Sequence, residues 1–431
     1  MINVKELKSG TRLAVCNMPG FEGVSFKMFV FCGSGNEIDP KDYGISHLIE
    51  HMFFKGTKKR NAYQIVQELD KLGIQSNAYT SSNTTCYYTY GTGETLEKSV
   101  EIISDMLFNS TFDEDELARE KLVVCEEIDM YQDKPDAVCE MALLNEFFKG
   151  TTFAHDIAGS KESVLNITRE QILKYYKKHY SPKNIILSFA GNITTEKAEE
   201  LVNKYFEPYF KKQEKFEYKP INVDFSIDKK QVITKKTIKQ AQLMIAYNAA
   251  NRYNDKETIL NGLISNMLGG GMSSRLFQEV REKLGLVYSI SSFNDVGDIA
   301  SVFSISLGTS PKKVPLALKT INCVIKEVVK NGFTEEELMQ AKNMTISALK
   351  LQSDSPSGMA TRIATSLQYK NKIVTKEETI EKINKVTLNE INKHVKKLFD
   401  DKNCILSMVA KNTDLNLFDY YKSSENCERI K

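Results

Sequence analysis

The chain has 431 residues, which at roughly 100 to 200 residues per domain is enough for two to four domains. Its 41% hydrophobic and 26% charged residues are typical of a soluble globular protein, and the formal charge of +2 gives no sign of a nucleic-acid partner. No apolar run reaches the ~18 residues of a membrane helix, so we expect no membrane association. The N-terminus lacks the basic stretch followed by an apolar stretch that is typical of a signal peptide.

The eight cysteines are scattered through the chain, mostly in apolar segments, and include no Cys-x-x-Cys pair. This distribution disfavours a cysteine zinc site and predicts reduced thiols in the core. Because disulfides are rare in the cytosol, reduced thiols indicate a cytoplasmic protein.

The first half of the chain alternates predicted strands and helices. Strands are predicted at residues 4–7, 11–17, 24–32, 75–80, 84–91 and 184–191. Helices are predicted at residues 61–72, 95–109, 113–130, 136–148, 167–180 and 194–205, the third with Asp113 as its cap. A charged, proline-bounded stretch follows, and we place a linker at 211–222 between a first domain at 1–210 and a second at 223–431.

Residues 44–54 are expected to form one more helix, with Ser46 as its N-cap. At roughly 100° per residue, His47, Glu50 and His51 fall within about a third of the helix circumference. Two imidazoles four residues apart are a usual platform for zinc, and a carboxylate between them can take a proton from water on the metal. The alternative is an amphipathic helix with two surface histidines, although two of the five histidines fall here.

A tetrahedral metal site would need a further protein ligand, and the helix predicted at 113–130 is rich in glutamates. The candidates are Glu116, Glu120, Glu126 and Glu127. Glu120 and Glu127 are seven residues apart and lie on nearly the same face, whereas Glu126 points about 100° away. Either end of that stripe could face the metal, and a solvated acidic helix face is the alternative.

The second half of the chain echoes the first. Residues 168–188 match residues 387–407 at a constant offset, each a helix leading into a buried strand, and residues 44–46 match residues 271–273. Aligned on the second match, the three metal-helix positions are occupied by Ser274, Phe277 and Gln278. We therefore expect two α+β domains, each a mostly antiparallel sheet with helices packed on one face, of which the second cannot hold the metal.

The metal-helix sequence also carries a family resemblance. His47-Leu-Ile-Glu50-His51-Met-Phe-Phe54-Lys-Gly-Thr resembles the signature of the pitrilysin/insulinase family of zinc peptidases, whose motif is the inverse of His-Glu-x-x-His. The resemblance spans nearly the whole chain. It indicates the branch of the family with shorter chains, which includes the catalytic subunit of the mitochondrial processing peptidase and its bacterial homologues. The family's third zinc ligand falls on Glu127, and a second family glutamate falls on Glu120.

The resemblance implies a role for each of these residues. It implies one zinc per chain bound by His47, His51 and Glu127, with Glu50 as general base. Glu120 would orient a ligand or tune its basicity. The substrate-binding residues would be Phe54 and the edge-strand residues Asn77, Ala78, Tyr79 and Thr80. From the second domain, Arg281 would hold the substrate backbone and Tyr288 would donate to the oxyanion.

These expectations amount to a zinc endopeptidase that acts on peptides or unfolded protein segments. Because family enzymes place four such halves around a chamber and one chain supplies two, a homodimer is implied. Two alternatives stay open, a non-catalytic peptide-binding or assembly subunit and a zinc hydrolase of another substrate class. His155, His179 and His394 lack ligand spacing and are expected to be structural or surface residues.

Overall fold

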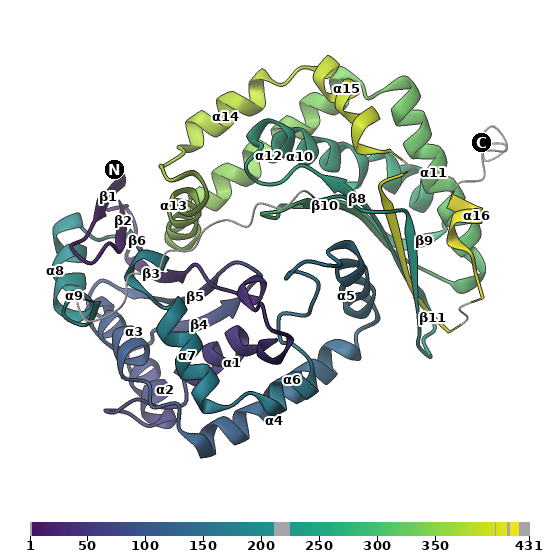
Figure 1. Cartoon of the computed structure of the whole chain (residues 1–431). Coiled ribbons are helices and arrows are strands. Elements are labelled where there is room, and N and C mark those ends of the chain that lie inside the picture. The colour runs from purple at the N-terminus through teal and green to yellow at the C-terminus, as the bar shows by residue number, and fades with distance from the viewer. Residues whose placement is uncertain (1, 211–224, 401, 412–413, 422–431) are drawn as a thin grey trace. The chain divides into compact units, whose positions relative to one another are not determined.

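The structure is a computed structural model that describes residues 2–210, 225–400, 402–411 and 414–421 (Figure 1). The expected linker at 211–222 lies outside the described residues. The chain forms two compact units, and each draws on both halves of the sequence. The first comprises Met1–Met130, Gly150–Lys219 and Lys350–Val374, and the second comprises Tyr131–Lys149, Pro220–Leu349 and Thr375–Lys431.

The first unit contains a six-stranded sheet. Its strands lie in the order β1 (Ile2–Glu6), β2 (Arg12–Asn17), β6 (Ile185–Gly191), β3 (Gly23–Val30), β5 (Thr85–Thr92) and β4 (Gln75–Thr80). Only β2 and β6 run parallel, and the other neighbours are antiparallel. Strand β6 is buried at every residue, as a central strand covered on both faces must be, whereas β4 alternates between exposed and half-buried residues at the sheet edge.

Helices of the first unit cover one face of this sheet. They are α1 (Ile45–Phe53), α2 (Ala62–Lys71), α3 (Leu96–Asn109), α4 (Glu114–Gln132), α6 (Lys161–Asn166), α7 (Arg169–His179), α8 (Thr195–Tyr205) and α9 (Glu207–Phe210). Aromatic stacking joins the layers, as between Phe53 of α1 and Tyr87 of β5, whose ring centroids are 4.9 Å apart. The predicted cap Asp113 accepts hydrogen bonds from the backbone N–H groups of Asp115 and Glu116 and so begins α4.

The opposite face of the first sheet is covered by a helix from the second half of the sequence. Helix α13 (Pro356–Lys370) packs on β2, β3 and β6 (Figure 1). The apolar cluster between them includes Ala14, Phe29, Ile186, Ala190, Ala360 and Ile363. Lys27 also donates to the hydroxyl of Thr361 at 2.9 Å. The fully buried character of β6 follows from this second layer.

The second unit repeats this arrangement. Its sheet has the order β7 (Lys230–Lys235), β11 (Cys404–Ala410), β8 (Ala241–Ala249), β10 (Ser301–Thr309) and β9 (Val287–Asp295), with only β7 and β11 parallel. Its longer helices are α10 (Asp255–Gly269), α11 (Val314–Asn331), α12 (Glu335–Ser353), α14 (Lys376–Lys385) and α15 (Leu388–Leu398), followed by the short α16 (Leu417–Tyr421). The strand order therefore matches β2, β6, β3, β5 and β4 of the first unit.

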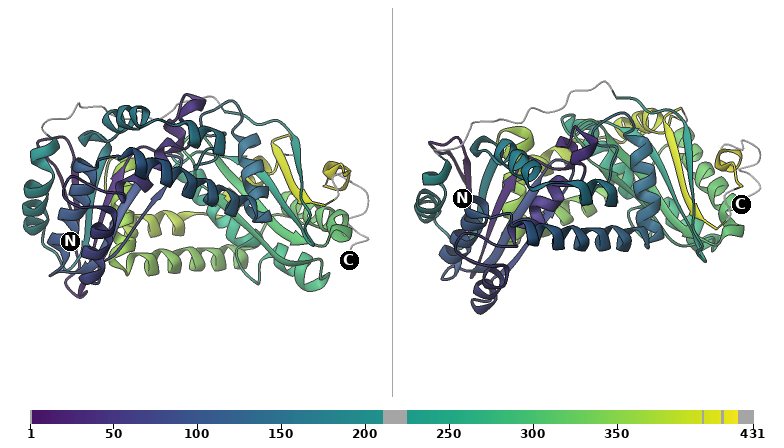
Figure 2. Two further views of the ribbon diagram at one scale, coloured as in Figure 1. Left: turned by 90° about the horizontal axis from the view of Figure 1, so that it is seen from below. Right: turned by 60° about the horizontal axis from the view of Figure 1, so that its bottom comes forward.

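A helix from the first half of the sequence covers the other face of this second sheet. Helix α5 (Pro135–Phe147) lies along the strands of the second unit in Figure 2, and its Cys139, Leu143 and Phe147 join a cluster with Met244, Val302 and Ile405. Each unit is thus an α+β sheet with most of its helices on one face. The single helix on the other face comes from the opposite half of the sequence, which we did not predict.

Two sequence-based details are wrong. Ser46 is not the N-cap of α1, because the helix begins at Ile45 after Gly44, and the Ser46 hydroxyl hydrogen-bonds Tyr175 of α7 at 3.0 Å. The alignment of Ser274, Phe277 and Gln278 with the metal helix also fails, because residues 271–273 follow α10. By element order, α10 takes the place of α1 between the strands β8 and β9.

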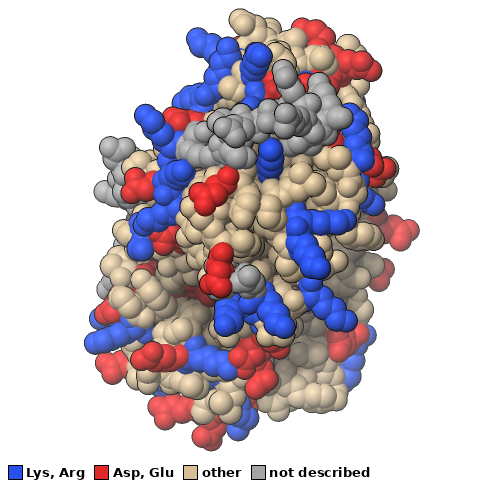
Figure 3. All heavy atoms as spheres, turned by 90° about the vertical axis from the view of Figure 1, so that its right-hand side faces the viewer, with Lys and Arg blue, Asp and Glu red and all other residues tan. Residues whose placement is uncertain are grey.

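The cysteines and the surface charges were also predicted from the sequence. Six cysteines (Cys16, Cys32, Cys86, Cys125, Cys139 and Cys404) are free and buried, but Cys323 is disulfide-bonded, so the prediction of reduced thiols is wrong for Cys323. No helix among the described residues is long and apolar enough to cross a membrane. Basic and acidic side chains are interspersed on the face shown in Figure 3.

Candidate metal centre

Helix α1 carries the three polar side chains of the predicted metal motif, His47, Glu50 and His51. Leu48, Ile49, Met52 and Phe53 are buried in the core, and this apolar stripe fixes the rotation of the helix. His47 and His51 then lie on the other side, with side chains 12% and 20% exposed. The imidazoles are therefore shielded but reachable.

Helix α4 brings a carboxylate to the two histidines. Glu127 Oε2 lies 3.7 Å from His47 Nε2 and 3.5 Å from His51 Nε2. The three donor atoms all lie within 4.8 Å of one another, and this is the one such group of histidine, cysteine and acidic side chains found among the described residues. Of the four glutamates that periodicity left open, Glu127 joins the histidines, and Glu116 instead pairs with Arg119.

Glu120 lies on the far side of His51 from Glu127. Its Oε1 is 2.8 Å from His51 Nδ1, and its Oε2 is 2.6 Å from the ammonium of Lys55. Burial opposes ionisation of this carboxyl, but the hydrogen bonds with His51 and Lys55 lower its pKa below the ordinary value. An ionised Glu120 accepts a hydrogen bond from the Nδ1–H of His51, which turns Nε2 toward Glu127. Lys55 was not predicted to contribute to the site.

The two histidines have opposite pKa shifts. Burial and the neighbouring His51 lower the pKa of His47 to about 4, so its imidazole is neutral near pH 7, the form that binds metals. Burial alone would lower the pKa of His51, but its hydrogen bonds to Glu120 and Glu127 raise it to about 9. A metal ion at His51 Nε2 would replace a proton there. Two imidazole nitrogens and a carboxylate oxygen at these separations fit a zinc ion.

Glu50 lies on α1 between the histidines but outside the donor cluster. Its side chain accepts a hydrogen bond from the hydroxyl of Thr80, the last residue of β4. The residue is 8% exposed, and burial raises the pKa of its carboxyl above the ordinary value. A carboxylate whose pKa is raised toward neutrality is suited to exchange protons with a bound water or a leaving group.

A cavity opens between α1, α2 and the edge strand β4. Its volume is about 790 Å³, and its lining includes Glu50, Phe54, Lys55, Val66 and Asn77. Strand β4 has no neighbour on its outer side within the first sheet. Tyr79 on this strand is 40% exposed. The residues predicted to bind substrate, Phe54 and Asn77 to Thr80, are thus grouped around this cavity and strand.

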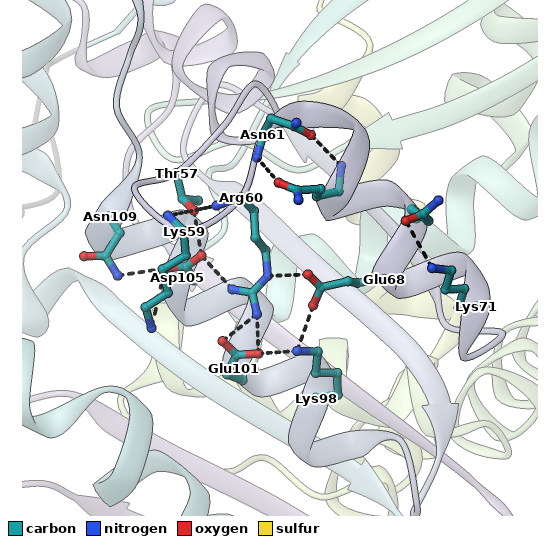
Figure 4. A network of polar contacts seen from close by, with 12 residues as sticks. Thr57, Lys59, Arg60, Asn61, Glu68, Lys71, Lys98, Glu101, Asp105 and Asn109 are labelled. Atoms are coloured by element: carbon teal, nitrogen blue, oxygen red, sulfur yellow. Dashed lines mark hydrogen bonds and ion pairs between the residues drawn. The ribbon is translucent and has the colours of Figure 1, made fainter.

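An ion-pair network fixes the loop that follows α1 (Figure 4). Arg60 donates to Glu68 of α2 at 3.0 Å and to Glu101 and Asp105 of α3 at 2.7 Å each. Asp105 also accepts from the hydroxyl of Thr57 at 2.7 Å. Because α2 forms one wall of the cavity, this network keeps that wall in place. The sequence offered no signal for it, since Glu101 and Asp105 are more than 40 residues from Arg60.

Arg281 and Tyr288 lie next to each other in the second unit. The Arg281 guanidinium is 5.5 Å from the centre of the Tyr288 ring. Tyr288 is 79% exposed on the edge strand β9, so its hydroxyl is accessible. The two side chains form a pair within this unit.

The remaining histidines have structural surroundings. His155 bonds the buried carboxylate of Glu37 at 2.9 Å, and His394 bonds Asn261 at 2.7 Å. The ring of His179 is tilted against that of Tyr175, with centroids 4.3 Å apart. None belongs to the candidate metal cluster of the described residues.

Sequence comparisons give the chain's relatives. The model of the insulinase family (peptidase family M16) matches residues 12–161, and that of the peptidase M16 inactive domain matches residues 166–345. The chain is similar to YmxG of Bacillus subtilis (strain 168), an uncharacterised zinc protease. The identity is 32% over 93% of this chain and 96% of that relative.

Solved structures share the fold over nearly the full length. A protease from Helicobacter pylori matches with a TM-score of 0.89 and 24% identity, covering 95% of this chain and 99% of that one. A chain of complex III2 from Candida albicans matches with a TM-score of 0.82 and 17% identity, covering 98% of this chain and 99% of that one. These likenesses establish the architecture of two similar α+β units.

Proposed function

Because the chain belongs to the insulinase family, peptidase family M16, we propose that it is a zinc-dependent endopeptidase acting on peptides or on unfolded, extended protein segments. The observation that carries this proposal is the donor set of His47, His51 and Glu127 on α1 and α4, with Glu50 beside it. Binding of a partner alone would not require that set. We infer one zinc ion per chain.

Each of the chain's own groups has a distinct task in this mechanism. When bound, zinc would supply Lewis acidity toward water and the scissile carbonyl. Glu50 accepts the proton of the attacking water at a carboxylate oxygen and delivers it to the leaving amine nitrogen. Glu120 keeps the Nδ1 proton on His51, so that Nε2 stays available. From the second unit, Tyr288 donates its hydroxyl to the oxyanion, and Arg281 holds the substrate backbone.

The edge strand suggests how substrate is held. A peptide in extended form would add to β4 along residues 77–80, next to the Thr80–Glu50 hydrogen bond. Main-chain hydrogen bonds contribute about 0.5 to 1.5 kcal/mol net each, so several are needed and tripeptides should be poor substrates. A homodimer would bring four units around one chamber and exclude tightly folded proteins. We further expect a cytoplasmic location.

A non-catalytic subunit is the alternative, because one protein of similar fold is a chain of complex III2. Zinc content separates the two functions. A protein that only binds or assembles has no need of stoichiometric zinc at His47, His51 and Glu127.

The test is digestion of a mixed peptide library by the purified chain, with and without a chelator. We expect internal peptide bonds to be cut, activity to disappear with chelator and zinc to restore it. One sequence should then be compared as a peptide of about twenty residues, as a tripeptide and inside a stably folded domain. Absence of cleavage by zinc-loaded protein would reject the endopeptidase, and equal cleavage of all three forms would reject the closed chamber.

A further inference from the structure

The first turn of α1 has no cap of its own, although this helix carries both candidate histidine ligands. Gly44 occupies the cap position with φ of 93°, and no side chain there accepts from the helix. A Cβ atom at this position would lie 2.4 Å from the carbonyl oxygen of Ala158, so only glycine fits. The free N–H groups of the first turn must therefore be satisfied from elsewhere in the chain.

Glu37 satisfies one of these groups, and the N–H of the cap residue Gly44, from outside the helix. Its side chain is fully buried, with Oε2 accepting from the Gly44 N–H at 2.8 Å and Oε1 accepting from the Ser46 N–H at 2.9 Å. A carboxylate at a helix N-terminus is also favoured by the helix dipole. Ser46 directly precedes His47, so Glu37 fixes the backbone next to a candidate metal ligand.

His155 in turn holds Glu37. Its Nε2 donates to Glu37 Oε2 at 2.9 Å, and its ring stacks on Tyr43 with centroids 3.7 Å apart and planes 4° apart. The hydroxyl of Thr152 donates to the Gly35 carbonyl at 2.7 Å, which ties the loop of His155 to the turn that carries Glu37. The group formed by Glu37, His155 and Tyr43 has no part in the proposed proton transfer or zinc binding.

We propose that Glu37, held by His155, is a positioning residue that orients His47 toward the metal; this inference rests on the proposed zinc site. Both carboxylate oxygens of Glu37 accept from N–H groups. An amide at this position can accept on one side only, and its NH₂ group would face an N–H donor on the other. The start of α1 would then loosen, and His47 would no longer be fixed for binding.

The first experiment compares Glu37→Gln with Glu207→Gln in the full chain. Glu207 is also a buried carboxylate of the first unit, but it accepts from the hydroxyl of Ser9, away from α1. We expect Glu37→Gln to lower zinc affinity by about 10- to 100-fold in a chelator competition and to shift the visible spectrum of the cobalt-substituted protein. Glu207→Gln should change neither. Equal zinc affinity and cobalt spectra in both variants would overturn the proposal.

A second pair of variants separates positioning from packing and serves even if Glu37→Gln does not fold. His155→Gln keeps an N–H donor for Glu37 but loses the aromatic stack on Tyr43, whereas His155→Phe keeps the stack and loses the donor. We expect His155→Gln to retain more zinc affinity than His155→Phe. The reverse order would mean that the ring only fills space and would reject the role given to Glu37.

Backbone exchange in zinc-free protein gives a readout that does not need the metal. We expect the amides of residues 44–47 to exchange with deuterium faster in Glu37→Gln than in wild type or in Glu207→Gln. Unchanged exchange there would contradict the proposal. If the wild type bound no zinc while the exchange result held, the proposed function would fail and the capping of α1 by Glu37 would stand.

Discussion

The two units share a strand order but differ in what stands on the corresponding helix. In the first unit, α1 carries His47, Glu50 and His51 beside the edge strand β4. In the second, α10 lies beside the edge strand β9, and the cavity of about 530 Å³ along them has small residues in its lining. They include Gly262, Ser265, Gly269 and Gly270. A cavity thus lies beside an edge strand in each unit, but the one candidate metal cluster found among the described residues belongs to the first unit.

This difference shows that the fold sets the location of a groove and not its activity. Both sheets have the same strand order and buried central strands. The two units differ in the polar side chains that one helix, α1, carries. Gly269 even approaches Ser292 so closely that an added Cβ would lie 2.5 Å from the Ser292 nitrogen. A ligand side chain could not be placed there without moving α10 away from β9.

The largest effect in this comparison is expected at Glu50. Because Glu50 is assigned to proton transfer and not to ligation, Glu50→Gln should lose about 10²- to 10⁴-fold in turnover while keeping its zinc. The matched change Glu257→Gln on α10 should leave turnover unchanged. Peptide cleavage and atomic absorption measure the two quantities. Loss of zinc in Glu50→Gln would contradict the assignment.

A large loss of zinc affinity is expected at Glu127. Glu127→Gln removes a charged oxygen ligand and should weaken zinc binding by at least about 100-fold, more than a change to a group that only supports a ligand. Glu126→Gln changes the neighbouring carboxylate on the same helix, outside the donor cluster, and should bind zinc like the wild type. Chelator competition is the measurement. Equal affinities would remove Glu127 from the site.

The second unit is tested at Tyr288. Its hydroxyl is exposed, so Tyr288→Phe should leave stability unchanged. We expect a loss of about 10-fold in kcat, less than the roughly 10²- to 10³-fold found for buried oxyanion donors, with zinc retained. Tyr253→Phe, at another exposed tyrosine of this unit, is the control. Unchanged kcat in Tyr288→Phe would mean that the second unit supplies no oxyanion donor.

A separate effect, outside the metal centre, concerns stability at acid pH. Burial lowers the pKa of His179 to about 4, from an ordinary value of 6.5. In the unfolded chain His179 therefore binds a proton near pH 6.5, whereas in the folded unit it stays neutral until about pH 4. The free energy of unfolding falls as pH is lowered from 6.5 toward 4, by up to ~3 kcal/mol.

His179→Gln should reduce this loss when urea unfolding of zinc-free protein is compared at pH 6.5 and pH 4.5. His394→Gln in the second unit should act in the same direction, because burial also lowers the pKa of His394. An identical pH dependence in wild type and His179→Gln would show that His179 is protonated in the folded state.

The sequence predicts those parts of the site that depend on local spacing. The helical periodicity of residues 44–54 placed His47, Glu50 and His51 on one face, and the family resemblance selected Glu127 from the acidic helix. Ser46 was misassigned as a cap because the acceptor is Glu37, whose position behind the helix depends on tertiary packing. The ion pair of Lys55 could not be predicted for the same reason, since its partner Glu120 lies on another helix.

The packing partners of α5 and α13 could not be predicted from the sequence either. Periodicity indicates that a segment is an amphipathic or apolar helix, but not which sheet it covers. Both helices follow a long helix and begin with proline, which marks their start but not their direction. Their assignment to units made mainly from the other half of the chain follows from tertiary contacts alone.

The exchange of these helices has a consequence for biosynthesis. The face of the first sheet formed by Ala14, Phe29 and Ile186 is covered by residues of α13. The first unit can therefore be completed only after Val374 has emerged from the ribosome, when most of the second half has also been translated. Until then the nascent chain presents an uncovered apolar sheet face.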